Sequence, residues 1–85
     1  MSTKYKYKSN ILEVEAVQWT GENVGEIGAF CNGKAQVDHR YKMWYITTPE
    51  GTMVAFVGDY VLKDAKGQLF PCKQETFDKV CTKVE

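Results

Sequence analysis

Residues 58–81, GDYVLKDAKGQLFPCKQETFDKVC, decide the fold because they hold the clearest run of local structure signals in the chain. The aromatic and β-branched residues at 60–62 favour a strand. The Asp-Ala-Lys-Gly sequence at 64–67 is typical of a type I turn, and residues 68–70 then return as the partner strand. Pro71 has no N–H to give to a ladder, so this strand should end there or lie at a sheet edge.

The apolar spacing changes after this hairpin. Phe77, Val80, Cys81 and Val84 follow one another at i, i+3, i+4 and i+7, which predicts one face of a closing helix. Such a short helix cannot be stable alone, so it should dock on the sheet.

The first strand upstream is expected at residues 11–19. Alternation places Leu12, Val14 and Ala16 on the core face, and Glu13 with Glu15 on a solvated face. The paired glutamates could form a catalytic dyad, but carboxylates on the wet side of a strand are the simpler interpretation.

A first helix is expected to begin after Asn23, with Glu26 three residues later in a capping-box spacing. Asn32-Gly33 should end this helix, because glycine readily adopts the left-handed conformation that follows a C-cap. Its apolar face is formed by Val24, Ile27, Phe30 and Cys31.

The middle of the chain predicts three further strands. Residues 35–40 form a weak strand, and 43–47 form a strong one with Trp44 and Ile46 on one face. After a type I turn at 48–51, the strand at 52–57 is apolar on both faces. We therefore expect it to be central, covered by a helix on one side and by another element or a second subunit on the other.

These segments together predict an α+β fold in one domain, residues 1–85. We expect a mostly antiparallel sheet of about five strands with two short helices, in the order β-α-β-β-β-β-β-α. A small curled barrel with capping helices is the alternative. Residues 1–9 form either a frayed arm or an edge strand.

Residues 4–8 alternate lysine and tyrosine. A basic and aromatic arm could contact phosphates and stack on bases. Edge-strand lysines that prevent edge-to-edge pairing are the simpler explanation, since the whole chain has eleven basic and eleven acidic residues. This balance argues against binding nucleic acid or acidic membranes.

Composition also favours a cytoplasmic location. No apolar run approaches the roughly 18–20 residues of a membrane span, and the N-terminal lysines are not followed by the apolar block of a signal peptide. Cys31, Cys72 and Cys81 make an odd count without a CxxC pair, which favours free thiols in a reducing compartment. Pairing of two of them is the alternative.

The sequence contains no catalytic or metal signature and none for a cofactor. His39 is the single histidine and lacks a neighbouring cysteine or second histidine, so it predicts no metal site. Cys72 lies near the start of the closing helix, where the helix dipole could lower the pKa of its thiol. An inert packed cysteine is the simpler interpretation.

A binding role is the stronger hypothesis. The chain has more large aromatic residues than a thin core can hide, and exposed ones would mark a contact surface. Lys63 and Lys73 lie on either side of the turn and second strand of the hairpin, residues 64–72, and Lys73, near a helix start, could help hold a phosphate or carboxylate. The candidate binding residues are Trp19, Trp44, Tyr45, Tyr60, Lys63 and Lys73.

The chain also resembles a family of small proteins encoded by bacteriophages and prophages. The resemblance rests on Gly58-Asp59-Tyr60, the glycine turn at Gly67, the Phe70-Pro71-Cys72-Lys73 sequence and Phe77. Residues 14–19 (VEAVQW) and 48–51 (TPEG) also match, whereas Cys81 stands where an aromatic residue is more usual.

The resemblance implies an accessory binding protein without catalytic activity. The leading hypothesis is that it occupies and blocks a host protein, such as a defence or transcription component. The alternative is a homo-oligomer that sequesters a nucleotide-like signal between subunits, and a weaker one is a structural component of the virion. The first predicts an exposed aromatic patch, and the second predicts a cleft lined by aromatic and basic residues.

Overall fold

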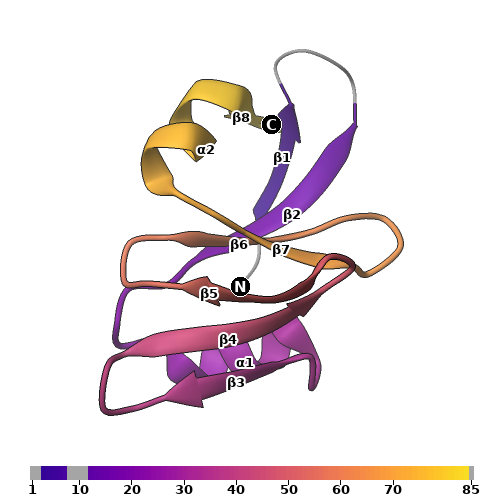
Figure 1. Ribbon diagram of the computed structural model, residues 1–85. Helices are drawn as coiled ribbons and strands as arrows, with labels where there is room; N and C mark the ends of the chain where they lie inside the picture. Colours follow the sequence, from indigo (N-terminus) through magenta and orange to yellow (C-terminus); the bar gives the residue numbers. More distant parts are fainter. Residues whose placement is uncertain (1–2, 8–11, 85) are drawn as a thin grey trace.

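The computed structural model describes residues 3–7 and 12–84 and has the predicted α+β architecture (Figure 1). Its elements in chain order are β1 (Thr3–Tyr7), β2 (Glu13–Gln18), α1 (Val24–Cys31), β3 (Ala35–Asp38), β4 (Met43–Thr48), β5 (Gly51–Ala55), β6 (Tyr60–Lys63), β7 (Leu69–Cys72), α2 (Gln74–Val80) and β8 (Cys81–Lys83).

The strands form two antiparallel sheets. Sheet A has five strands in the order β7-β6-β2-β1-β8, and sheet B has three in the order β3-β4-β5. The predicted element order is therefore confirmed, with an additional strand at each end of the described chain. The three middle strands pair through local turns and leave the main sheet, so the strands do not share one continuous sheet.

The hairpin of β6 and β7 follows the sequence prediction closely. The Asp64 carboxylate accepts hydrogen bonds from the backbone N–H groups of Lys66 and Gln68, and Gly67 has a positive φ of 80°. Both features are typical of a turn that begins with aspartate and ends with glycine. Pro71 lies within β7, which is an edge strand, so its missing N–H interrupts no ladder.

Strand β2 of sheet A has buried residues on both faces, which the sequence did not indicate. Val17 and the following Trp19 face the main core, whereas Val14 and Ala16 face a second cluster. The expectation for Leu12 was wrong, because it precedes the paired part of β2 and is largely exposed.

The main core lies between sheet A, sheet B and α1. Helix α1 contributes the predicted face, with Ile27, Phe30 and Cys31 buried. The helix ends at Asn32, which adopts the left-handed conformation. The buried members of this core are Val17, Trp19, Ile27, Phe30, Cys31, Trp44, Ile46, Ala55, Val61 and Leu69.

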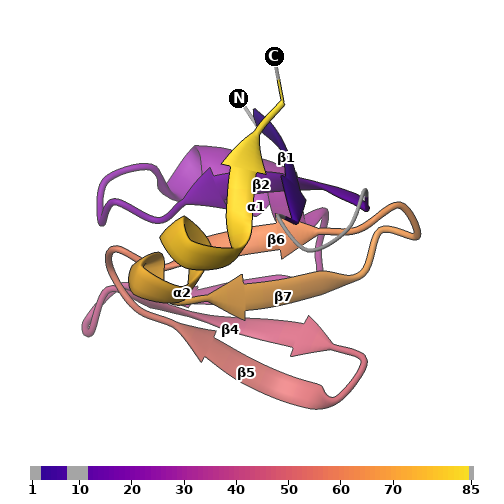
Figure 2. The same ribbon diagram turned by 90° about the horizontal axis from the view of Figure 1, so that it is seen from above.

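The second cluster lies under α2, on the opposite face of sheet A (Figure 2). Phe77 stacks on Tyr60 with ring centroids 3.8 Å apart and meets the edge of Tyr5 at 4.6 Å. The predicted docking of the closing helix is confirmed by this buried phenylalanine. The helix stops earlier than predicted, because Cys81 begins strand β8 and pairs with Tyr7.

The alternating lysines of the N-terminal segment also have a structural explanation. The hypothesis that this segment forms a strand is confirmed for β1. The expected edge position was wrong, because β1 lies between β2 and β8. Lys4 lies opposite Glu15 and Lys6 opposite Glu13, so charges of opposite sign face each other across the pair. The two glutamates are therefore cross-strand partners of lysines.

Strand β5 corrects another prediction. It was expected to be central, yet it is an edge strand of sheet B. The side chains that follow it, Phe56 and Val57, are 49% and 50% exposed. A strand with two apolar faces indicated burial on both sides, but among the residues that the structure describes no element covers the outer side.

Candidate protein-contact surface

The face of sheet B that points away from the core is the candidate functional site, and we call it the outer face. Strand alternation defines it, because Trp44 and Ile46 of β4 are buried inside whereas the residues between them point outward. Cross-strand register adds the matching residues of β5. The outer face consists of Met43, Tyr45 and Thr47 on β4, Thr52 and Val54 on β5, and Gln36 and Asp38 on β3.

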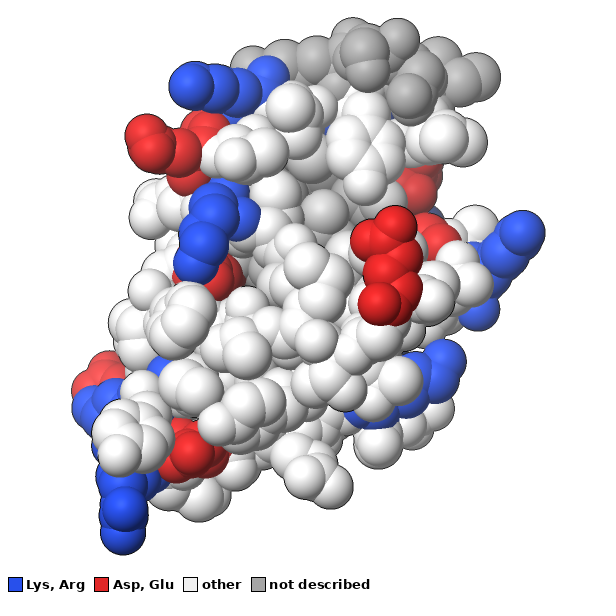
Figure 3. Space-filling model, viewed as in Figure 1, with Lys and Arg blue, Asp and Glu red and all other residues white. Residues whose placement is uncertain are grey.

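The part of the outer face on β4 and β5 contains no charged residue, and Asp38 of β3, opposite Met43, is the charged residue at its margin. Figure 3 shows this side of the molecule, and the acidic and basic side chains lie around its margin rather than over the middle of β4 and β5. Tyr45 is exposed at its centre and lies directly opposite Val54. Phe56 and Val57, which follow β5, are also exposed, and Val57 lies beside Gly21. The patch therefore combines exposed aromatic rings with a lack of charge.

An ion pair between the buried Asp59 and the exposed Lys73 lies at one end of this surface. The Asp59 carboxylate is buried, accepts a hydrogen bond from the N–H of Phe56 at 2.8 Å and lies 3.0 Å from the Lys73 ammonium group. Lys73 is exposed on its other side, and its ammonium group lies 4.6 Å from the centroid of the Phe56 ring. Gly58, with a φ of 99°, donates its N–H to the Trp19 carbonyl.

This arrangement explains part of the 58–73 signature in structural terms. Gly58 adopts the positive φ that the turn requires, and the Asp59 carboxylate accepts the hydrogen bond from the Phe56 N–H across the turn. Lys73 neutralises the charge of the buried Asp59. Lys73 was proposed as an anion-binding residue, and its nearest described anion is the carboxylate of Asp59 within the same chain.

Trp19 and Trp44 correct the prediction of a contact surface. They are 1% and 3% exposed and meet edge to face with centroids 5.9 Å apart, so they form the centre of the main core. The Trp19 Nε1–H donates to the Lys42 carbonyl at 2.9 Å. The Trp44 Nε1–H is buried and has no hydrogen-bond partner among residues 3–7 and 12–84. Neither indole is available to a partner.

The other predicted residues lie in three different places. Tyr45 is on the outer face, Tyr60 stacks on Phe77 on the far side of sheet A, and Lys63 lies over the Phe30 ring at 4.4 Å. Burial raises the pKa of Tyr60, as expected for a phenol held against an aromatic ring. The structure therefore does not bring the six predicted residues together.

Sequence reasoning missed the exposed residues Phe56 and Val57. Both were assigned to a strand covered on two sides, because alternation cannot tell a buried apolar face from an exposed one. One signal in the sequence could have identified them. Residues 52–57 are apolar on both faces, but the sequence predicts only two short helices to cover the strands, so part of this apolar surface had to stay exposed.

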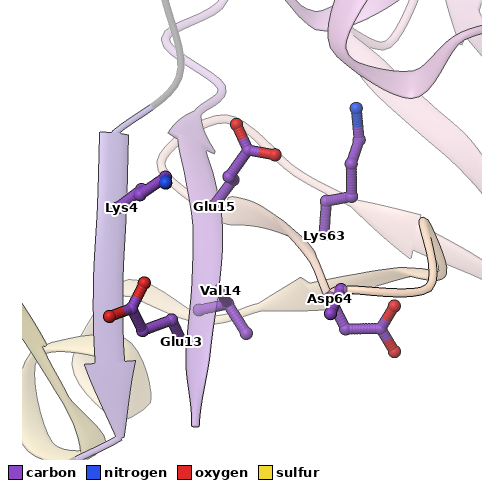
Figure 4. Close-up of a pocket in the computed structure, with 7 residues that line it drawn as sticks. Lys4, Glu13, Val14, Glu15, Lys63 and Asp64 are labelled. Atoms are coloured by element: carbon purple, nitrogen blue, oxygen red, sulfur yellow. The ribbon is translucent and has the colours of Figure 1, made fainter.

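One shallow hollow crosses sheet A beside the β6–β7 turn (Figure 4). Its volume is about 210 Å³, and Lys4, Glu15 and Lys63 lie side by side on three neighbouring strands. Glu13 and Asp64 also line it, so it has three acidic and two basic side chains. Such a lining gives no excess of positive charge for a phosphate.

Neither Cys31 nor Cys72 has an activated thiol. All three cysteines are free, and burial raises the pKa of Cys31 to about 11. Burial also raises the pKa of Cys72, followed by smaller effects of Cys81 and Asp59, which favours the simpler interpretation of an inert, packed cysteine over a thiol activated by the helix dipole. Cys72 lies in β7 before the helix begins at Gln74, and desolvation outweighs any helix dipole there.

The remaining observations are negative and concern only the described parts of the chain. No group of three or more His, Cys, Asp or Glu side chains there could hold a metal ion. None of the described helices has the length and apolar composition needed to cross a membrane. No protein-family model matches the chain, and neither curated proteins nor solved structures give a match.

Proposed function

We propose that this chain is a non-catalytic accessory protein that binds another protein through the outer face of sheet B and blocks it by occupation. The observation that carries the proposal is the surface around Tyr45 on β4 and β5, which has no charged side chain on these two strands and is followed in the chain by exposed Phe56 and Val57. The centres of protein interfaces are depleted in charge and enriched in aromatic residues, and a few such residues supply most of the binding energy.

The resemblance to small bacteriophage and prophage proteins suggests the class of partner. A protein of that type acts in the cytoplasm of a bacterial host, so the proposed partner is a host protein, such as a component of defence or transcription.

Sequestration of a nucleotide-like signal by a homo-oligomer is the alternative, and it has less support. The hollow on sheet A holds more acidic than basic residues, and the two tryptophans that could have stacked on a base are buried. The alternative itself places the ligand in a cleft formed between copies of the chain. A structural role in the virion has no supporting observation of its own.

The test is affinity capture from a bacterial host extract with three immobilised proteins. They are the wild type, Tyr45→Lys and the control Val80→Lys, which places the same charge on an apolar residue of α2 that is exposed to a similar degree. We expect one host protein to be retained by the wild type and by Val80→Lys and lost with Tyr45→Lys. Equal retention by all three would contradict the assignment of the outer face.

Native mass spectrometry of the gently purified protein separates this proposal from the alternative. Retention of a nucleotide-sized mass on an oligomer would favour sequestration over binding of a host protein. A protein free of small ligands that still captures a partner would favour occupation of a protein surface.

A further inference from the structure

The edges of the two sheets differ in how they are protected against pairing with another strand. Pro71 lies in the edge strand β7, Lys83 in β8 and Asp38 in β3. Proline and charged side chains are the usual means of preventing edge-to-edge association. Strand β5, with the sequence Gly-Thr-Met-Val-Ala, has neither proline nor charge. Among the described strands, β5 is therefore the edge that lacks these safeguards.

From this contrast we infer that two copies of the chain associate by antiparallel pairing of their β5 strands, which joins the two B sheets into one sheet of six strands. The inference goes beyond the proposed function and does not depend on it, since it uses the edge of β5 rather than the outer face. A symmetric dimer of this kind uses the same surface on both copies, so that surface must complement itself.

The length of β5 fixes the register of this pairing. The strand has five residues, so a twofold axis that pairs its whole length passes through Met53. Gly51 then lies opposite Ala55 of the second copy, and Thr52 opposite Val54. No charged residue of either strand meets a like charge, and the net charge of zero leaves no long-range repulsion between copies.

The same register brings opposite charges together at both ends of the paired strands. Glu50, which precedes β5, lies opposite Phe56 of the second copy, and the ammonium group of Lys73 lies 4.6 Å from the Phe56 ring within each chain. Glu50 of one copy is thus brought to the side of Lys73 of the other, twice per dimer. The Lys73 side chain is 62% exposed despite its contact with Asp59, which leaves it accessible to a second carboxylate. This charge complementarity identifies a second copy as the occupant of the edge.

Dimerisation would also extend the surface described above. Thr52 and Val54 belong to the outer face, so their pairing with the second copy would make the two outer faces continuous across the axis. The edge itself is short, and interfaces well below about 800 Å² per partner are weak. A reversible dimer that depends on protein concentration is expected.

The test is sedimentation equilibrium of the full chain over a range of concentrations. The wild type should move from a mass of 9.7 kDa towards twice that value as concentration rises. Met53→Lys places two ammonium groups on the axis and should raise the dissociation constant by about tenfold or more. The matched control Val80→Lys should dimerise like the wild type.

Circular dichroism shows whether Met53→Lys folds. If it does not fold, two further variants test the inference in its place. Thr52→Lys changes an exposed residue of the same edge and should also weaken the dimer. Glu50→Lys should weaken it to a smaller extent, with an effect that shrinks at high salt. A wild type that stays monomeric at every concentration would overturn the inference, and so would a dimer that tolerates both β5 variants.

Discussion

Sheet A and sheet B differ in how completely they are covered. Sheet A has the main core on one face and α2 with its aromatic cluster on the other, so β2 and β6 are buried on both sides. Sheet B meets the core with one face only, and its outer face and the edge of β5 are open in the described structure. A chain of 85 residues therefore has enough apolar elements to cover the central strands of one sheet on both faces, while one face of the other sheet stays open for contacts.

The largest expected loss of stability comes from removing the α2 side chain that covers the second cluster on sheet A. Phe77→Ala removes the ring that stacks on Tyr60 and should lower the free energy of unfolding by about 3–5 kcal/mol. Urea unfolding followed by circular dichroism measures the change. A variant as stable as the wild type would show that α2 does not close the second cluster.

The next effect concerns the main core, which lies between the two sheets and α1. Burial raises the pKa of Cys31 from 9.0 to about 11, so the folded state keeps its proton where the unfolded state loses it. Stability should therefore be complete below about pH 9 and fall by about 2–3 kcal/mol as the pH rises to about 11. Urea unfolding over this pH range tests it.

The control for this prediction is Cys31→Ala. The variant should be less stable than the wild type at neutral pH, because it leaves a small cavity in the main core. It should nevertheless lose less stability than the wild type as the pH rises. An identical pH dependence in both proteins would contradict the burial of this thiol.

The two tryptophans of the shared core should respond differently to the same substitution. Trp19→Phe removes an indole N–H that donates to the Lys42 carbonyl, whereas Trp44→Phe removes one without a partner in the described structure. Both lose similar volume, so Trp19→Phe should cost about 1–3 kcal/mol more. Thermal unfolding of the two variants measures the difference, and the reverse order would contradict the assigned hydrogen bond.

The smallest effect is expected on the outer face. Tyr45→Lys and Thr47→Lys should each change the free energy of unfolding by no more than about 0.5 kcal/mol, since neither side chain packs in a core cluster. The same unfolding measurement applies. A loss of stability comparable to that of Phe77→Ala would mean that the outer face is structural rather than available for contacts.

The sequence predicted local structure well. The 60–72 hairpin, the buried face of α1 and the inward orientation of Trp44 with Ile46 all follow from turn residues and alternation. These signals act between residues close in the chain, where turn geometry and side-chain periodicity are sufficient. The α+β class followed from them.

Long-range pairing could not be predicted in the same way. Cys81 has helical spacing from Phe77, but its pairing with Tyr7 depends on the opposite end of the chain, and this contact ends the helix. The apolar residues at 52–57 indicated two covered faces, but the pattern does not say whether a covering element exists. The candidate site was missed for this reason, and Tyr45 alone of the six predicted residues lies on the outer face.

Backbone hydrogen exchange of the full chain tests the contrast between the two sheets most directly. In dilute solution, the amides of β2 and β6 should exchange slowly and those at the open edge of β5 fast, because β5 is the uncovered edge. At high protein concentration, β5 should gain protection while the other sheet edges do not change. Protection of β5 equal to that of β2 in dilute solution would contradict the account.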